Sequence, residues 1–288
     1  MVLGTSNPVD SQVCFGGVAR NVAENLSRLG VFSSLVSVLG EDENGRGIIR
    51  HLGELGVDTQ CCEFSGRYRT AEYVAVLEPC GDLVVGLADM AIFDAFTPDI
   101  IESHWPEIAS SEWIFADCNL PPATLAALVS SARKQRLNLA IDAVSTVKAT
   151  RLPQDLSGIG ILFLNFDEAR ALVGEEGICL SSFEDTSSAL LERGACRLIL
   201  TNGPDGLLVA DTVTSLRLRA AGVNVVDVTG AGDALIAGTL ASMIAGHSVA
   251  TAARLGMIAA QLTIEHSGSV RPDLSVALIE TRLKHPFQ

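Results

Sequence analysis

The sequence predicts an α/β protein in which a mainly parallel sheet is covered by helices on both faces, with a small β lid. Two observations lead to this fold class. From residue 113 to residue 264, short apolar runs alternate with helical segments, which is typical of a buried parallel sheet. Before that region, two strand-like runs flank a turn at residues 79–82. They predict a hairpin over residues 68–88 that is able to lie over a site.

The expected elements follow one another in a regular order. Residues 21–29 form an amphipathic helix, residues 34–40 form a strand, and residues 44–55 form a helix that ends at Gly56. After the hairpin we expect strands at residues 113–116, 137–141, 160–164, 197–200 and 206–210, and helices at residues 122–135, 167–173, 234–244 and 249–264. Ligands of such sheets bind outside the carboxyl ends of the strands, so we expect the functional site at that edge.

The composition favours one domain and disfavours some partners. We expect one domain over residues 1–288, because no linker, repeat or low-complexity tract interrupts the pattern. The net charge of −14 disfavours duplex nucleic acid as a partner, since that requires a basic surface. No apolar run approaches the length of a membrane span. Seven cysteines without a C-x-x-C motif are typical of a reduced chain. We therefore expect a cytoplasmic protein that acts on a small molecule.

The clearest chemical signal is the run DVTGAGD at residues 227–233, which leads directly into an apolar helix. Backbone N–H groups at a helix start have no partner within the helix, and the helix dipole adds positive charge there. Gly230, Ala231 and Gly232 are therefore expected to hold a phosphate group. Asp233 is then well placed as a base, and the segment predicts phosphoryl transfer from a nucleotide to a hydroxyl group. An ordinary capped helix start is the alternative.

A pair of glycines precedes the first predicted helix. Gly16 and Gly17 lead into this helix, and Asn21 lies on its opening turn. Paired glycines allow a polyol to approach the backbone, and an amide side chain both donates to hydroxyl groups and accepts from them. We therefore expect Gly16, Gly17 and Asn21 to bind the hydroxyl groups of the acceptor.

Taken together and in this order, the two glycine-containing segments resemble the two signatures of the ribokinase-like (PfkB) family of carbohydrate and nucleoside kinases. Further landmarks agree: GEDENG at residues 40–45, NFDE at residues 165–168 and TNG at residues 201–203. The resemblance spans nearly the whole chain. It implies a ribokinase-like three-layer α/β/α sandwich with a small β lid, ATP and Mg²⁺ as cofactors, and Asp233 as the catalytic base.

The resemblance also implies roles in nucleotide binding. Asn165 and Glu168 match an N-x-x-E pattern that organises Mg²⁺ and its waters, with Glu168 acting through water. Helix capping is the alternative for this pair. Thr201 and Gly203 resemble contacts to the nucleotide, and a plain turn is the alternative there.

A monovalent cation site, for K⁺, is a further implication of the resemblance. Asp227 and Thr229 resemble residues that help to hold such a cation, aided by backbone carbonyl groups from a later loop, for which residues 263–269 are the candidate. Asp227 is equally well explained as a carboxylate that caps a turn.

Within the family, the segments at residues 4–8, 16–30 and 68–73 look most like pseudouridine kinases. This likeness implies transfer to the 5′-hydroxyl of pseudouridine, with ribose, fructose and adenosine as alternative acceptors. It adds Arg20 and Asn25 as residues that position the base or brace the loop. An arginine that is solvated or paired within its helix is the alternative for Arg20.

One part of the family pattern is not found. Members usually begin with an apolar strand, an Asp that binds the sugar and the first lid strands, whereas Gly4 lies only a dozen residues before Gly16. We therefore expect the N-terminal strand to be missing, and a truncated, noncatalytic nucleotide-binding form is an alternative to the kinase. The lid hairpin offers strand edges that could pair with a second copy, which predicts a homodimer.

Overall fold

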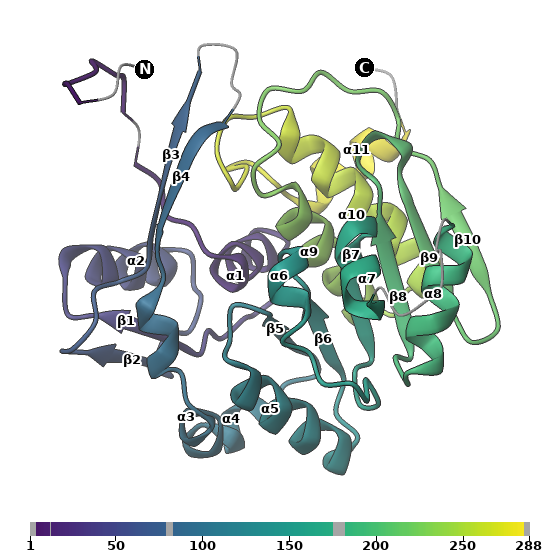
Figure 1. Ribbon diagram of the computed structural model, residues 1–288. Coiled ribbons are helices and arrows are strands. Elements are labelled where there is room, and N and C mark those ends of the chain that lie inside the picture. Colours follow the sequence, from purple (N-terminus) through teal and green to yellow (C-terminus); the bar gives the residue numbers. More distant parts are fainter. Residues whose placement is uncertain (1–3, 12, 79–82, 175–181, 285–288) are drawn as a thin grey trace.

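The computed structural model describes residues 4–11, 13–78, 83–174 and 182–284. Its centre is a six-stranded sheet with the order β10-β9-β8-β7-β6-β5 (Figure 1). Its strands are β5 (Ile114–Asp117), β6 (Leu139–Asp142), β7 (Ile161–Asn165), β8 (Arg197–Thr201), β9 (Leu207–Asp211) and β10 (Ser215–Leu218). Strands β5 to β8 are parallel, and β9 is antiparallel to both of its neighbours. The mainly parallel sheet that the sequence predicts is therefore confirmed.

Helices cover both faces of this sheet. One face carries α3 (Pro98–Ser103), α4 (Trp105–Ala109), α5 (Pro122–Gln135), α6 (Thr146–Ala149), α7 (Phe166–Val173) and α8 (Phe183–Glu192). The other face carries α1 (Val18–Arg28), α9 (Ala231–Ile244), α10 (Val249–Ile264) and α11 (Val276–Lys284). Alternate side chains of one strand serve the two layers: Leu162 packs with the first group and Ile161 with the second. The three-layer α/β/α arrangement is thus confirmed.

A smaller region beside the sheet contains the predicted hairpin. Strands β1 (Ser37–Gly40) and β2 (Cys62–Ser65) form a parallel pair, joined through α2 (Glu43–Glu54). Strands β3 (Glu72–Leu77) and β4 (Leu83–Asp89) form an antiparallel hairpin that projects away from the helices (Figure 1). The predicted turn at residues 79–82 lies outside the described residues.

Several short elements differ from the sequence prediction. The strand expected at residues 34–40 begins only at Ser37, and Ser34 forms a single bridge to Asp58. Strand β2, strand β10 and the helices α3, α4, α6, α8 and α11 were not predicted, nor were the 3-10 turns η1 (Ala91–Ala95) and η2 (Gly203–Asp205). These elements are short or carry many polar residues, so their sequences lack a clear periodicity. Residues 4–11 and 13–16 lie outside any strand.

The helices α9 and α10 pack in unusually close contact. A methyl group added at Gly256 would overlap the backbone oxygen of Leu235 and the hydroxyl of Thr239, which itself donates to Leu235 at 2.7 Å. A methyl group at Gly238 would reach the Cα of Gly256 at 2.9 Å.

The described part of the chain contains no helix with the length and apolar character of a membrane span.

We predict that Gly256→Ala lowers the free energy of unfolding by about 1–3 kcal/mol, the usual cost of overpacking a tight contact. Gly53→Ala in α2 is the matched control, because its methyl group would meet nothing within 4 Å. That variant is expected to gain up to about 1 kcal/mol, since alanine favours a helix more than glycine does. Urea unfolding of both variants measures the difference. Equal stability of the two would contradict the packing described here.

Candidate active site

Polar side chains gather at the carboxyl ends of the parallel strands. Asp117 ends β5 and lies directly opposite Asp142, which ends β6. Asn165 ends β7 and lies directly opposite Thr201, which ends β8. The start of α1 faces the same edge, because the N–H of Ala19 donates to Asp117. The start of α9 does so too, because the charge of Asp117 acts on Asp233. These polar side chains therefore lie at the edge of the sheet where we expect the site from the sequence.

The start of α9 is built around one glycine. Gly230 precedes the helix with a φ of 76°, and a methyl group on it would overlap the carbonyl of Ser269. Glycine is required there by both the backbone conformation and the close approach. The N–H of Ala231 donates to Val228 at 3.3 Å, whereas those of Gly232 and Asp233 meet no acceptor among the described residues. A methyl group on Gly232 would meet nothing within 4 Å. This helix start thus has unpaired donors, and the space beside Gly232 is open.

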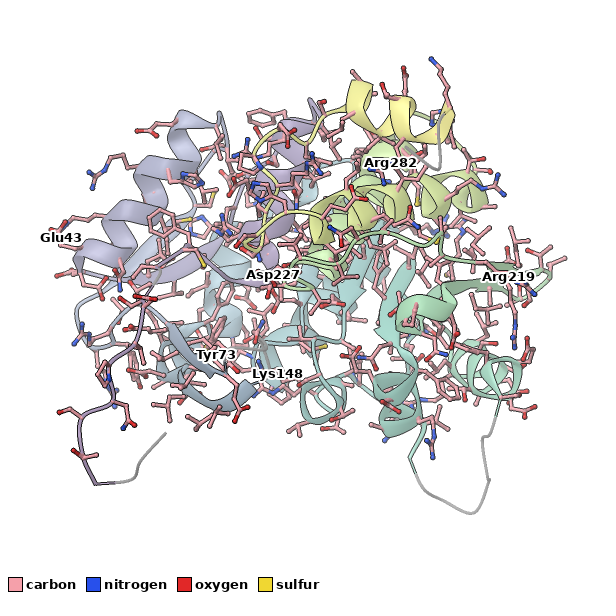
Figure 2. The ribbon with its side chains drawn as sticks, turned by 90° about the horizontal axis from the view of Figure 1, so that it is seen from above. Glu43, Tyr73, Lys148, Arg219, Asp227 and Arg282 are labelled. Carbon is pink, nitrogen blue, oxygen red and sulfur yellow. The ribbon has the colours of Figure 1, made fainter. Side chains whose placement is uncertain are left out.

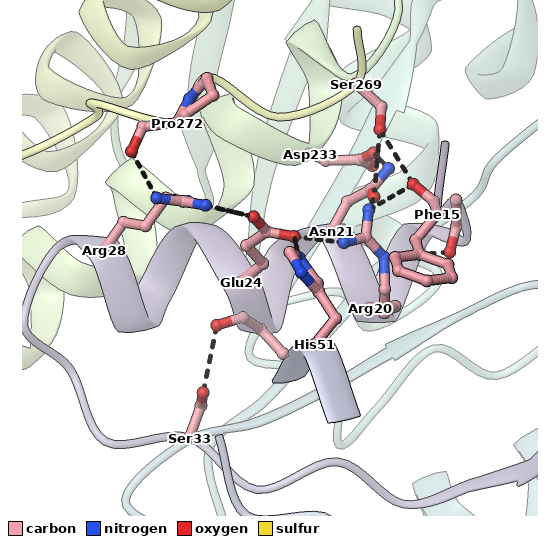
Figure 3. Close-up of polar contacts among 12 residues, drawn as sticks. Phe15, Arg20, Asn21, Glu24, Arg28, Ser33, His51, Asp233, Ser269 and Pro272 are labelled. Atoms are coloured by element: carbon pink, nitrogen blue, oxygen red, sulfur yellow. Dashed lines mark hydrogen bonds and ion pairs between the residues drawn. The ribbon is translucent and has the colours of Figure 1, made fainter. Parts of the chain in front are cut away.

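Asp233 stands on the first turn of α9 and is half-buried. Its Oδ2 accepts a hydrogen bond from Nδ2 of Asn21 at 2.6 Å (Figure 3). Burial raises the pKa of Asp233 to about 6; the donation from Asn21 and the charge of Arg20 oppose the rise, and the charge of Asp117 adds to it. The carboxylate is therefore mostly ionised at neutral pH and remains able to take up a proton.

The glycine pair opens α1 beside this carboxylate. Gly17 precedes the helix with a φ of 98°, and Asn21 donates its backbone N–H to the carbonyl of Gly17 at 2.8 Å. Gly16 is exposed, and a methyl group added there would meet nothing within 4 Å. The structure therefore brings Gly16, Gly17 and Asn21 together beside Asp233, although they are more than 200 residues apart in sequence.

Arg20 points into the protein rather than into open space (Figure 3). It is 6% exposed, and its guanidinium donates to the carbonyls of Gly16 at 3.1 Å and Phe15 at 2.8 Å. It also donates to the carboxylate of Glu24 and to Oδ1 of Asn21. Of the roles considered from the sequence, these contacts support both bracing of the loop and the alternative of an arginine paired within its own helix.

Asn165 and Glu168 form the start of α7. Oδ1 of Asn165 accepts from the backbone N–H of Glu168 at 2.8 Å, and the carboxylate of Glu168 accepts from the N–H of Asn165 at 2.8 Å. This is a capping box, so the capping alternative is confirmed. Glu168 is buried, and this burial raises its pKa. A carboxylate in this state is suited to a nearby cation, because a positive charge would offset the cost of its burial.

Two neighbouring carboxylates share the same edge. Asp117 accepts from the backbone N–H groups of Ala19 at 3.1 Å and Asn119 at 2.8 Å, and burial still raises its pKa. Burial raises the pKa of Asp142 well above its usual range, and the charges of Asp233 and Glu168 add to the effect. Across the described residues, no three His, Cys, Asp or Glu side chains converge to bind a metal ion by themselves. A divalent cation would therefore need ligands from a bound phosphate as well.

Lys148 lies near these carboxylates, and the sequence analysis did not single it out. It lies on α6, just beyond β6, and is labelled in Figure 2. Its Nζ donates to Oδ1 of Asn119 at 2.5 Å. Burial lowers the pKa of Lys148, and the charge of Asp117 opposes that change. Val144, between β6 and α6, has a φ of 68°, a rare conformation for a β-branched residue. The signal in the sequence that could have indicated Lys148 is its position shortly after the end of a predicted buried strand.

The end of β8 borders a cavity. Gly203 opens η2 with a φ of 52°, and the hydroxyl of Thr201 lies 3.5 Å from the carbonyl of Leu164. A cavity of about 500 Å³ is lined by residues of this turn and by Arg217 and Arg219. A second cavity of about 310 Å³ shares these two arginines and reaches the buried Gln261. The Nε2 of Gln261 has no hydrogen-bond partner.

Asp227 lies beside the predicted later loop. Its carboxylate accepts from the N–H groups of Thr229 at 2.9 Å and Gly268 at 3.0 Å, and its own N–H donates to the carbonyl of Ile264 at 3.1 Å. Burial tends to raise the pKa of Asp227, but the two accepted bonds lower it below its usual value. The turn-capping role is thus observed, and Asp227 and residues 263–269 are adjacent. Figure 2 shows Asp227 near the middle of the molecule, with Arg219 far toward its edge.

The fold and this site define a phosphotransferase that acts on a hydroxyl group of a sugar or nucleoside. The chain belongs to the pfkB family of carbohydrate kinases, whose profile matches residues 6–275. It is 31% identical to the pseudouridine kinase of Escherichia coli strain K12 over 94% of this chain and 87% of that protein.

Solved structures agree with the family and with a ribokinase-like fold. A carbohydrate kinase from Agrobacterium tumefaciens is 33% identical and superposes with a TM-score of 0.86, covering 99% of this chain and 91% of that chain. A protein described as Ribokinase II from Escherichia coli, in complex with ATP and Mg²⁺, superposes with a TM-score of 0.81 at 16% identity, covering 98% and 94%. The predicted family and fold are confirmed.

Substitutions at two glycines of the α9 start are expected to affect different properties, ATP binding at Gly232 and stability at Gly230. We predict that Gly232→Val keeps the wild-type unfolding temperature, because its side chain would point into open space, but weakens ATP binding at least about tenfold by occupying the place of the phosphate. Gly230→Val is expected to lose more than about 2 kcal/mol of stability, from overlap and an unfavourable φ. Calorimetric titration with ATP and thermal unfolding measure the two effects. Wild-type ATP affinity in Gly232→Val would contradict this assignment.

Proposed function

We propose that the protein transfers the γ-phosphate of ATP to the 5′-hydroxyl of pseudouridine. The observation that carries the proposal is the 2.6 Å hydrogen bond between Asn21 and Asp233, because it joins the acceptor-side glycine motif to a helix start suited to phosphate. The choice of pseudouridine rests on the 31% identity to a pseudouridine kinase. Gly16 and Gly17 leave the backbone open for the ribose hydroxyl groups of the acceptor.

Asp233 is the general base in this proposal. As the hydroxyl oxygen forms its bond to the γ-phosphorus, its proton passes to the Asp233 carboxylate, and the bond from phosphorus to the bridging oxygen of ADP breaks. In a loose transition state the proton leaves late, so a strong base is not needed. A pKa of about 6 suits this task at neutral pH, because the group is ionised beforehand and can still accept a proton.

The phosphate groups lie against the start of α9 in this proposal. Gly230, Ala231 and Gly232 form the turn around them, and the unpaired N–H of Gly232 supplies a donor whose direction is set before binding. Mg²⁺, when bound, neutralises charge on the phosphate oxygens. Glu168 fits such a cation, directly or through water, because it is a buried oxygen ligand with a raised pKa. The backbone N–H of Asn165 donates to its carboxylate and holds it in place.

The remainder of the nucleotide extends toward the end of β8. Thr201 and Gly203 flank Asn202, which lines the larger cavity. The unpaired Nε2 of Gln261, at the smaller cavity, provides a donor for a ring nitrogen of the base. We also assign a monovalent cation, K⁺, to the region of Asp227, Thr229 and residues 263–269, which lie together.

We predict that Asp233→Asn lowers kcat about 100- to 10,000-fold, the usual contribution of a general base, and leaves the unfolding temperature near that of the wild type. The assay measures ADP release with pseudouridine, ribose, fructose and adenosine as separate acceptors. Asp155→Asn is the control, since Asp155 lies at the surface in a pair with Arg133. Near-wild-type turnover by Asp233→Asn removes it as the base. If another acceptor is turned over faster, that acceptor is the substrate in place of pseudouridine. If ATP raises the unfolding temperature but no product forms with any acceptor, the protein is a noncatalytic nucleotide-binding form.

The β3–β4 hairpin is proposed as both lid and dimer contact. In the described residues its strands pair only with each other. The cross-strand partners Val74 and Leu87 are 44% and 58% exposed, which places an apolar pair on one face of the hairpin. Burial of such a face and of its open strand edges against a second copy would remove both from water.

We predict that the wild type forms a homodimer and that Val74→Lys with Leu87→Lys converts it to a monomer, because two charges would have to be buried in the contact. Light scattering coupled to size exclusion measures the mass. Val213→Lys is the control, because Val213 is 88% exposed on the far turn between β9 and β10. A wild-type monomer at micromolar concentration, or a double variant that remains dimeric, would exclude the hairpin as the dimer contact.

A further inference from the structure

The orientation of the Asn21 side chain determines what Asp233 meets. An amide has a donor end and an acceptor end, and only the donor end stabilises an ionised carboxylate. In the structure Nδ2 faces Asp233 at 2.6 Å, and Oδ1 faces the guanidinium of Arg20. A guanidinium only donates, so the amide end beside Arg20 must be its oxygen. The hydroxyl of Ser269 also lies 3.4 Å from this oxygen.

Arg20 is itself held in one position. Of the five N–H groups of a guanidinium, one donates to Gly16, and others donate to Phe15, Asn21 and Glu24. Little donor capacity is left for a ligand. The carbonyls of Phe15 and Gly16 belong to the loop that opens α1, so the same group that orients the amide also fixes the acceptor-side glycine.

Glu24 holds Arg20 from the opposite side. It is 3% exposed. Its Oε2 pairs with Arg20 and lies 3.0 Å from Nε2 of His51 in α2, and its Oε1 pairs with Arg28 at 2.6 Å. Burial would raise the pKa of Glu24, but the contacts with Arg28, His51 and Arg20 lower it below its usual value. Figure 3 shows the unbroken series of contacts from Arg28 through Glu24, Arg20 and Asn21 to Asp233.

We propose that Arg20 and Glu24 are positioning residues for the catalytic base: they hold the Asn21 amide with its NH₂ group toward Asp233. This inference rests on the proposed role of Asp233. A buried ion pair is a weak source of stability, since apolar residues of similar size often serve as well. Its contacts here have a specific effect, because they exclude the flipped amide, in which an oxygen would face the carboxylate.

The charges around Asp233 show why this orientation matters. The charge of Asp117, at the end of β5, disfavours the ionised form of Asp233, and Asp142, at the end of β6, lies close enough for the charge of Asp233 to raise its pKa. Among the described residues, the amide of Asn21 and the positive charge of Arg20 act in the opposite direction. Loss of the Asn21 bond therefore raises the pKa of Asp233, and the acid limb of activity moves to higher pH because the base must be ionised.

The first test measures the ionisation of Asp233 without any turnover. Carbon-13 labelled aspartate is titrated by NMR in the full-length protein, and the Asp233 signal is identified as the one lost in Asp233→Asn. We expect a midpoint near 6 in the wild type and a rise of at least about half a pH unit in Arg20→Met and in Asn21→Leu. The double variant Arg20→Met with Asn21→Leu should shift no further than the larger single shift, because both changes remove the same bond.

Further variants separate position from charge. Arg20→Lys keeps the positive charge but loses the planar fork that reaches Asn21 and Glu24 together, so it should also raise the midpoint. Glu24→Gln leaves Arg20 in place with a weaker partner, so it should raise the midpoint of Asp233 by a smaller amount. This variant replaces Arg20→Met in the test if Arg20→Met does not fold. Arg193→Met is the matched control, because Arg193 likewise donates to backbone carbonyls, at Leu172 and Gln154, far from the site.

The second test follows kcat against pH with ATP and the acceptor that the wild type uses. Arg20→Met is expected to lose at least about threefold in kcat at pH 5, where a half-unit rise in the midpoint has nearly its full effect, with little change in the KM for ATP. Its acid limb should move together with the NMR midpoint. An unchanged midpoint in folded Arg20→Met, or in Arg20→Lys and Glu24→Gln, overturns the inference. If the wild type phosphorylates no acceptor, the proposed function fails, and the NMR titration still decides whether Arg20 orients Asn21.

Discussion

The hydrogen bond from Asn21 to Asp233 is the contact on which the arrangement of the site depends. It ties the first turn of α1 to the first turn of α9, so the two glycine-containing helix starts lie side by side. Each start presents unpaired backbone N–H groups or open glycine surface to the same space. One helix start alone could bind an anion, but transfer of a group requires donor and acceptor to be held within bonding distance of each other.

Close packing behind the site makes this juxtaposition possible. Gly230 allows the carbonyl of Ser269 to approach the α9 start, and Gly256 allows α10 to lie against α9. In both places a single added methyl group would overlap backbone atoms. The glycines of this region therefore differ in purpose: some permit close contact within the protein, whereas Gly232 leaves space for a ligand.

The electrostatics of the site follow from its place in an acidic protein. The chain has a net charge of −14, and the carboxylates of Asp117, Asp142 and Asp233 lie at one edge of the sheet, where burial raises the pKa of each. Backbone N–H groups and the buried Arg20 offset part of this negative charge. Lys148 lies close enough to interact with Asp117. A polyanionic nucleotide is therefore best met by directed donors and a cation rather than by a broad basic surface.

The amino-acid sequence by itself determined the fold class, the long helices and buried strands, and the two glycine motifs, because periodicity and local turn chemistry are properties of neighbouring residues. Helix α10 and helix α5 were predicted with their observed bounds. Only the tertiary structure decided that the Arg20–Glu24 pair is buried, that Lys148 reaches Asn119, and that Asn21 meets Asp233. These contacts join segments that are remote in sequence or depend on burial, and neither can be read from local pattern. The raised pKa of Asp233 is also decided by the tertiary structure, because it reflects the charges and the exclusion of water that the assembled fold creates.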